Sequence, residues 1–164
     1  MLPSLAFTRI TNIMEKKEHF KVLSVVFLVL KRSNEILLLR RYNTPWLKGY
    51  YSLVAGHLDG GETAKQAMIR EAKEEANIVL KPEDLTVVHV MHRMRSGKEF
   101  MDVYLEADMW EGEVENREPE RHDNLGWFHV DQLPEPFLPE VKYALENIAR
   151  GIFYSEFDAF KSIK

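Results

Sequence analysis

The segment of residues 56–78 constrains this chain more than any other part of the sequence. It joins a glycine-rich turn to a run of helix-forming residues that carries Glu71, Glu74 and Glu75. Residues three and four apart lie on one face of an α-helix, so these three carboxylates are expected to project together. Their mutual repulsion would weaken the helix unless a cation neutralised them. Magnesium held by carboxylates and substrate phosphates is the usual arrangement, so the segment predicts metal-dependent chemistry on a phosphorylated substrate.

The spacing of this segment resembles the signature of the Nudix hydrolases. In that signature a glycine is followed after five residues by a glutamate, and after seven more by Arg-Glu-apolar-x-Glu-Glu-x-Gly-apolar. Gly56 and Glu62 fill the first two positions, and residues 70–78 fill the rest. Asn77 replaces the usual glycine, which ends the helix in a left-handed conformation that asparagine also tolerates. The resemblance implies an α+β fold of the Nudix type, an α/β/α sandwich around a mixed β-sheet.

The resemblance also implies a set of metal ligands. The expected ligands are the side chains of Glu71, Glu74, Glu75 and Glu120 and a backbone carbonyl of Gly56 or Ala55. Glu120 lies in a later loop, where many members of the family supply an extra glutamate. An ordinary loop charge is an equal alternative for Glu120, and His122 and Asp123 are poorer candidates for the same place.

Two further residues of the signature are expected to support the ligands. Arg70 lies four residues before Glu74, so its guanidinium could hold that carboxylate through an ion pair. The alternative is an ordinary surface pair that contributes only about 0.3–0.5 kcal/mol. Glu62 begins the helix, and in the family it more often braces the site than binds the metal.

The implied cofactor is Mg²⁺, with Mn²⁺ as an alternative, and the implied reaction is hydrolysis of a diphosphate linkage by a metal-activated water. Glu71, Glu74 or Glu120 could orient or deprotonate that water. Arg40, Arg41 and His57 lie near the signature loop in sequence and are the candidates for binding the substrate. Nearby aromatic residues could stack on a base, although in mixed sheets such side chains more often pack in the core.

A nucleoside triphosphate pyrophosphohydrolase is the leading interpretation of the function. The region after the signature lacks the downstream proline associated with ADP-ribose pyrophosphatases. One alternative is a hydrolase of another nucleoside diphosphate derivative, such as a nucleoside diphosphate sugar or ADP-ribose. Another is a non-catalytic Nudix-fold module that senses nucleotides. An isomerase of isoprenoid diphosphates would want a reactive cysteine, and the chain has none.

Composition narrows the possible partners and surroundings. A net charge of −4 provides no broad basic surface, which argues against binding of a nucleic acid polymer. The apolar run at residues 22–30 is far too short to span a bilayer, and Lys31 and Arg32 follow it, so a buried strand is expected. The absence of cysteine fits a reducing compartment. We therefore expect a cytoplasmic protein that binds a small nucleotide, contacts no membrane and could form a homodimer.

The order of the predicted elements indicates one domain. We expect an N-terminal arm over residues 1–19, the Nudix domain over 20–150 and an aromatic C-terminal tail over 151–164. Strands are predicted at residues 22–30, 35–41, 50–55, 85–94, 99–110 and 125–130. Thr63 and Gln66 form a capping-box pattern that begins the first helix, and a second helix should end at Gly151.

Overall fold

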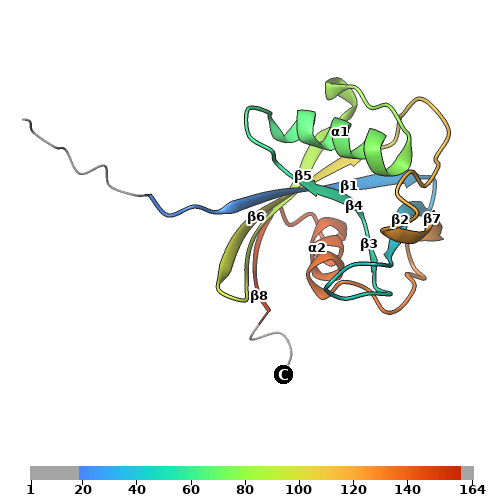
Figure 1. The fold of residues 1–164 in the computed structure, drawn as a ribbon. Coiled ribbons are helices and arrows are strands. Elements are labelled where there is room, and N and C mark those ends of the chain that lie inside the picture. Colours follow the sequence, from blue (N-terminus) through green and yellow to red (C-terminus); the bar gives the residue numbers. More distant parts are fainter. Residues whose placement is uncertain (1–18, 160–164) are drawn as a thin grey trace, which may run out of the picture.

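Within residues 19–159, the part of the chain that the computed structural model describes, eight strands form a mixed β-sheet with one helix on each face (Figure 1). The strands are β1 (Leu23–Arg32), β2 (Glu35–Arg41), β3 (Tyr51–Ser52), β4 (Val54–His57), β5 (Thr86–Arg95), β6 (Lys98–Ala107), β7 (His122–His129) and β8 (Tyr154–Asp158). The helices are α1 (Ala64–Ala76) and α2 (Pro139–Ala149), and a short 3-10 turn spans Pro82–Asp84. The predicted α/β/α sandwich is confirmed.

The sheet combines parallel and antiparallel pairs. Its main path runs β3-β2-β1-β6-β5-β8, while β4 pairs with β1 and β7 pairs with β2. The pairs β1–β6 and β5–β8 are parallel, and the others are antiparallel. Strand β1 divides one edge between two partners: residues 25–28 pair with β4, and residues 31 and 32 pair with β2. Residues of β1, β2 and β4 line a common cavity, so this division of the edge shapes the site.

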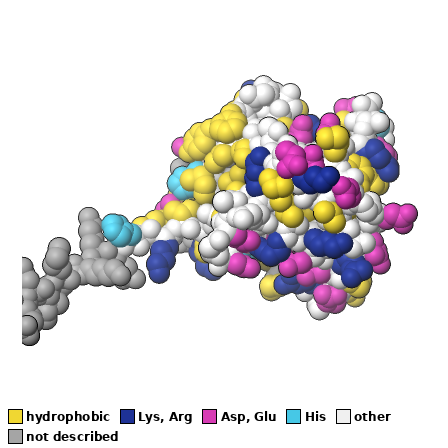
Figure 2. Space-filling model, turned by 90° about the horizontal axis from the view of Figure 1, so that it is seen from above, with side chains coloured by type: hydrophobic (Ala, Val, Ile, Leu, Met, Phe, Trp, Pro, Cys, Tyr) yellow, Lys and Arg dark blue, Asp and Glu magenta, His cyan; other side chains and the backbone are white. Residues whose placement is uncertain are grey.

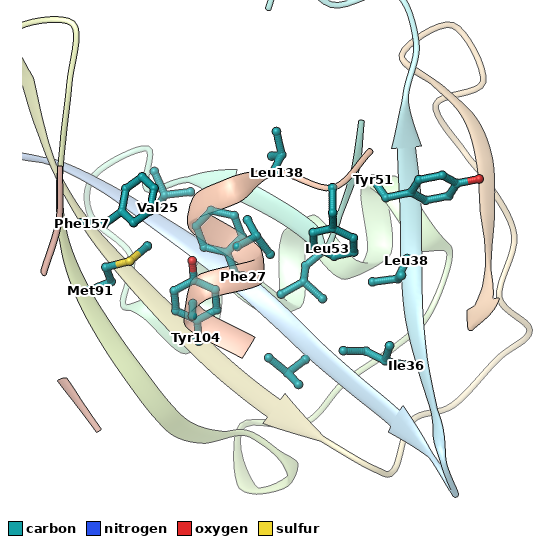
Figure 3. Packing of buried hydrophobic residues seen from close by; sticks show 14 of the residues in the cluster. Val25, Phe27, Ile36, Leu38, Tyr51, Leu53, Met91, Tyr104, Leu138 and Phe157 are labelled. Atoms are coloured by element: carbon teal, nitrogen blue, oxygen red, sulfur yellow. The ribbon is translucent and has the colours of Figure 1, made fainter. Parts of the chain in front are cut away.

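Both faces of the sheet are covered, which explains why β1 is apolar at successive positions rather than at alternate ones. Val25 and Phe27 point toward α2, where they join Met91, Tyr104 and Leu138 in one apolar cluster (Figure 3). The intervening side chains of β1 pack with α1 in a second cluster on the other face. The sheet therefore lies between two separate cores.

Helix α1 begins and ends as the sequence predicts. The Thr63 hydroxyl accepts the N–H of Gln66 at 3.3 Å, and the Gln66 side chain accepts the N–H of Thr63 at 2.8 Å. Both halves of the capping box are therefore present. At the other end Asn77 has φ 60° and ψ 17°, the left-handed conformation that ends many helices.

Several elements differ from the predicted ones, and β6 ends at Ala107, three residues before the end of the predicted strand at 99–110. The expected strand at residues 50–55 is divided into β3 and β4, and β7 begins at His122, three residues earlier than predicted. The C-terminal tail forms β8, which pairs with β5, and its Phe157 is buried in the α2-side core. Only two side chains of β8 point inward, and this alternation with exposed residues is too short to predict a strand from the sequence.

The expected N-terminal arm lies outside the described residues, apart from His19. Neither α1 nor α2 has the length and apolar content needed to cross a bilayer.

The burial of Phe157 predicts that β8 is an integral part of the folded unit. Phe157→Ala should lower the free energy of unfolding by about 3 kcal/mol, because it leaves a cavity beside Tyr143, whose ring centroid lies 5.7 Å away. Phe153→Ala, at a side chain that is 57% exposed, is the matched control and should change it by less than about 0.5 kcal/mol. Urea unfolding checks both values, and equal effects would contradict an integral β8.

Candidate active site

The carboxylate of Glu75 is buried at the centre of the candidate site. Its Oε2 accepts the backbone N–H of Ala55 at 3.0 Å, which joins the last turn of α1 to strand β4. Burial raises the pKa of Glu75 to about 8, and the nearby carboxylates of Glu71 and Glu118 act in the same direction. A buried carboxylate with a raised pKa is poised to release its proton when a cation binds.

The carboxylate of Glu71 occupies the space that a side chain at Gly56 would fill. A Cβ atom at residue 56 would lie 1.8 Å from Oε1 of Glu71, so this carboxylate would have to move from its position beside β4. Burial raises the pKa of Glu71, although the guanidinium of Arg70 opposes this shift. The signature glycine therefore allows α1 to approach β4 closely enough to place two glutamates against it.

Arg70 binds several acceptors of the signature at once. Its guanidinium donates to Glu71 at 2.6 Å, to Glu62 at 2.8 Å and to Glu74 at 3.3 Å, and also to the carbonyl of His57 at 3.0 Å. The predicted pair with Glu74 is thus present, but the contacts with Glu62 and Glu71 are shorter. Glu74 is the outermost of the three glutamates, with 54% of its side chain exposed. The arginine holds the signature loop and the helix in one arrangement.

The loop between β6 and β7 is attached to the end of α1. The N–H groups of Glu115 and Arg117 donate to the carbonyls of Ala76 and Glu75, at 3.0 and 3.1 Å. Carbonyls in the last turn of a helix have no partner within it, so the loop satisfies acceptors that would otherwise be open. This attachment brings the next residue, Glu118, over the carboxylate of Glu75.

Glu75, Glu118 and His122 form the one trio among residues 19–159 whose possible ligand atoms all lie within 4.8 Å of one another. The N–H of His122 donates to the carbonyl of Glu118 at 2.9 Å, so a single turn of the loop carries both side chains. Nε2 of His122 lies 3.7 Å from Oε1 of Glu75. Burial lowers the pKa of His122, which favours the neutral imidazole that can bind a metal. The trio can therefore hold a divalent cation.

The predicted loop ligand Glu120 is exposed and does not belong to this trio, so its role stays a prediction. The sequence analysis did not single out Glu118, and it placed His122 below Glu120 as a candidate ligand. Their spacing of four residues was a usable signal, because one tight turn places such a pair on the same side. The loop contained too many polar residues for that spacing to stand out.

A cavity of about 360 Å³ extends from the trio along the sheet. Gly56, His57 and Arg41, three of the residues expected at the site, line it together with Glu75. Arg41 donates to the carbonyl of Trp46 at 3.1 Å, and no carboxylate of residues 19–159 lies within ion-pair distance of its guanidinium. The other predicted arginine, Arg40, does not line the cavity and pairs with Asp123 through two hydrogen bonds of 2.7 and 2.9 Å.

A second cavity, of about 610 Å³, lies between the β1–β2 turn and α2. It is larger, but none of its lining residues belongs to the signature or to the trio. The chemistry of the site therefore belongs to the smaller cavity.

On the α1 side of the molecule acidic and basic side chains are intermixed, and no broad basic surface is visible there (Figure 2).

The raised pKa of Glu75 predicts how stability depends on pH in the absence of metal. Above about pH 4.5 the unfolded chain loses this proton, whereas the folded protein keeps it up to about pH 8. Unfolding free energy should therefore fall through this range, and Glu75→Gln should remove that part of the fall. Urea unfolding at pH 5 and pH 8.5 with a chelator tests this, with Glu74→Gln as the exposed control. An identical pH dependence in wild type and Glu75→Gln would contradict the prediction.

Two relatives of this chain among known proteins carry names that describe nucleotide chemistry. A NAD-capped RNA hydrolase, NudC, of Stutzerimonas stutzeri is 30% identical over 136 residues, which cover 81% of this chain and 44% of that protein. An ADP-ribose pyrophosphatase of Methanocaldococcus jannaschii is 38% identical over 61 residues, or 37% of this chain and 36% of that protein. This chain thus spans less than half the length of these two relatives.

Solved structures share the fold. The crystal structure of a MutT NUDIX hydrolase from Burkholderia pseudomallei superposes with a TM-score of 0.71 at 30% identity, covering 77% of this chain and 98% of the other. The solution structure of the E. coli ORF135 protein, at 24% identity and a TM-score of 0.68, supports the fold alone. The NUDIX domain model matches residues 21–148, nearly the whole of the described sandwich, and the chain therefore belongs to the NUDIX family.

Proposed function

We propose that this protein hydrolyses a diphosphate linkage in a nucleotide, with Mg²⁺ as the cofactor and a nucleoside triphosphate as the expected substrate. The observation that carries the proposal is the position of the buried Glu75. Its carboxylate lies within 4.8 Å of possible ligand atoms of Glu118 and His122, and Glu75 also lines the cavity that contains residues of the signature loop. A metal held there would lie beside any phosphate that enters the cavity.

The residues present fit a divalent cation. Glu75 and Glu118 supply carboxylate oxygens, which Mg²⁺ and Mn²⁺ prefer, and the imidazole of His122 is more compatible with Mn²⁺. When bound, the cation supplies positive charge that offsets the charge of the phosphates and favours attack by water. Glu71 is the next carboxylate along the helix face, and it acts on the pKa of Glu75 through its charge.

Side chains of this chain perform the remaining tasks. Arg41 has no carboxylate partner at ion-pair distance within residues 19–159, so its guanidinium can neutralise a phosphate in the cavity. Burial raises the pKa of Glu71, which makes this carboxylate a stronger proton acceptor for the attacking water. Arg70 keeps Glu71 in place, and Glu62 in turn holds Arg70.

A second candidate is hydrolysis of another nucleoside diphosphate derivative, such as ADP-ribose. The names of the two relatives, an NAD-capped RNA hydrolase and an ADP-ribose pyrophosphatase, favour it. A non-catalytic sensing module is less well supported, because this chain keeps Glu71, Glu74 and Glu75 of the signature. A nucleotide panel containing both triphosphates and dinucleotides separates these candidates.

Hydrolysis should require both metal and Glu75. Wild-type protein with Mg²⁺ or Mn²⁺ should release phosphate or pyrophosphate from at least one nucleotide of the panel, and a chelator should abolish the release. Glu75→Gln should lower kcat by about 100-fold or more, because the variant loses an anionic ligand. Phosphate release measured over time provides the rate. If no nucleotide is hydrolysed and Glu75→Gln changes neither activity nor metal binding, the proposal fails.

The two loop glutamates can be separated by parallel substitutions. Glu118→Gln should weaken Mn²⁺ binding by about 10-fold or more, because Glu118 lies in the trio with Glu75. Glu120→Gln, two residues away at an exposed position, is the matched control and should change binding less. Calorimetric titration with Mn²⁺ measures both affinities. A larger effect at Glu120 would support the ligand expected from the family resemblance instead.

A further inference from the structure

The far end of the 360 Å³ cavity contains a group of charged residues that metal binding does not use. Arg93 and Arg95 alternate on β5, so both point to the face of the sheet that α2 covers. Asp102 on β6 and Glu140 in the first turn of α2 are the nearby carboxylates. We call this end of the cavity the recess, and its charged residues are Arg93, Arg95, Asp102 and Glu140.

Arg93 is buried with an unused donor. Only 5% of its side chain is exposed, and its guanidinium lies 4.1 Å from the centroid of the Phe100 ring. Nε and Nη2 both donate to the carboxylate of Asp102, the latter at 3.0 Å. The remaining nitrogen, Nη1, has no hydrogen-bond partner. An unpaired donor beside a cavity is costly, so it marks a place where a ligand acceptor would stabilise the protein.

Glu140 places an acceptor between two such donors. Its Oε1 lies 3.9 Å from Nη1 of Arg93 and 3.6 Å from Nη1 of Arg95, and both separations exceed hydrogen-bond distance. The guanidinium of Arg95 lies 3.2 Å from the centroid of the Trp46 ring, which holds it flat. The recess thus presents a donor, an acceptor and a donor around one carboxylate oxygen.

The charge of the recess favours a neutral ligand. Within the recess two arginines face two carboxylates, so a phosphate entering it would lie against Glu140, although the cations of Arg41 and Lys98 also line the cavity. A planar, neutral edge with acceptors on either side of a donor would instead satisfy all three groups.

We propose that the recess binds the base of the substrate and selects the imide edge of uracil or thymine. The two carbonyl oxygens would accept from Arg93 and Arg95, and N3–H would donate to Glu140. Cytosine presents an acceptor at N3 and an amino donor beside it, so it would leave Glu140 and one arginine unpaired. Guanine and adenine also lack the acceptor-donor-acceptor sequence. This inference rests on the proposed hydrolase function, because it assigns the substrate of that same cavity.

The comparison of UTP with CTP is the sharpest test, because the two differ only at position 4 of the base and the proton on N3. With Mg²⁺, kcat/KM should be at least about tenfold higher for UTP, since an unmatched buried polar group lowers affinity by about that factor. UDP-glucose is measured beside UTP to show which uracil compound is the better substrate. Preference for CTP, GTP or ATP would overturn the inference.

Glu140→Gln should reduce the ratio of UTP to CTP by about tenfold, because an amide can donate to N3 of cytosine. Glu146→Gln, at an exposed position on the same helix, is the control and should leave the ratio unchanged. Arg95→Gln provides a second variant in case loss of the buried carboxylate impairs folding. If both recess variants fold and keep the wild-type ratio, the recess is only structural and the inference is wrong.

Binding of UMP and CMP by calorimetric titration separates this inference from the proposed hydrolysis. Tighter binding of UMP by about tenfold, lost in Glu140→Gln, would support the base assignment even if no nucleotide were hydrolysed. Hydrolysis of nucleotides without a preference for uracil or thymine would leave the proposed function standing and overturn the assignment.

Discussion

The hydrogen bond from the N–H of Ala55 to the buried carboxylate of Glu75 is the interaction on which the site depends. It forms because Gly56 lets α1 approach β4, with the carboxylate of Glu71 in the space that a side chain would fill. The same helix end offers open carbonyls to the β6–β7 loop. One close approach of a helix to a strand therefore determines where the acidic ligands and the loop meet.

Burying that carboxylate is unfavourable, as its raised pKa indicates. The fold offsets this cost in part with a backbone donor, and a bound cation would offset the remainder. Arg70 performs the opposite task nearby, because it neutralises the carboxylates of Glu71 and Glu62. The signature thus contains one acidic group left for a cation and others already held by the protein, although Glu71 and Glu75 lie only about one helical turn apart.

At the far end of the cavity, too, buried charged groups are stabilised by partners within the protein. Arg93 and Asp102 form a buried ion pair across neighbouring strands, and Glu140 comes from an α-helix more than thirty residues later in the chain. Alternation on β5 and β6 was visible in the sequence, but the partner from α2 was not. Side chains that meet only through the packing of a helix on a sheet leave no local pattern.

Local patterns were sufficient for the elements. The capping box at Thr63, the left-handed Asn77 and the apolar run of β1 depend on neighbouring residues, so the sequence alone determined them, together with the family and the acidic helix face. Tertiary structure decided which side chains meet. Glu118 and His122, rather than Glu120, lie over Glu75. Arg41, rather than Arg40, lines the cavity. Tertiary structure also decided that the C-terminal segment forms β8. These outcomes depend on contacts between segments that are distant in the sequence, and such contacts form only when the segments pack together in the folded protein.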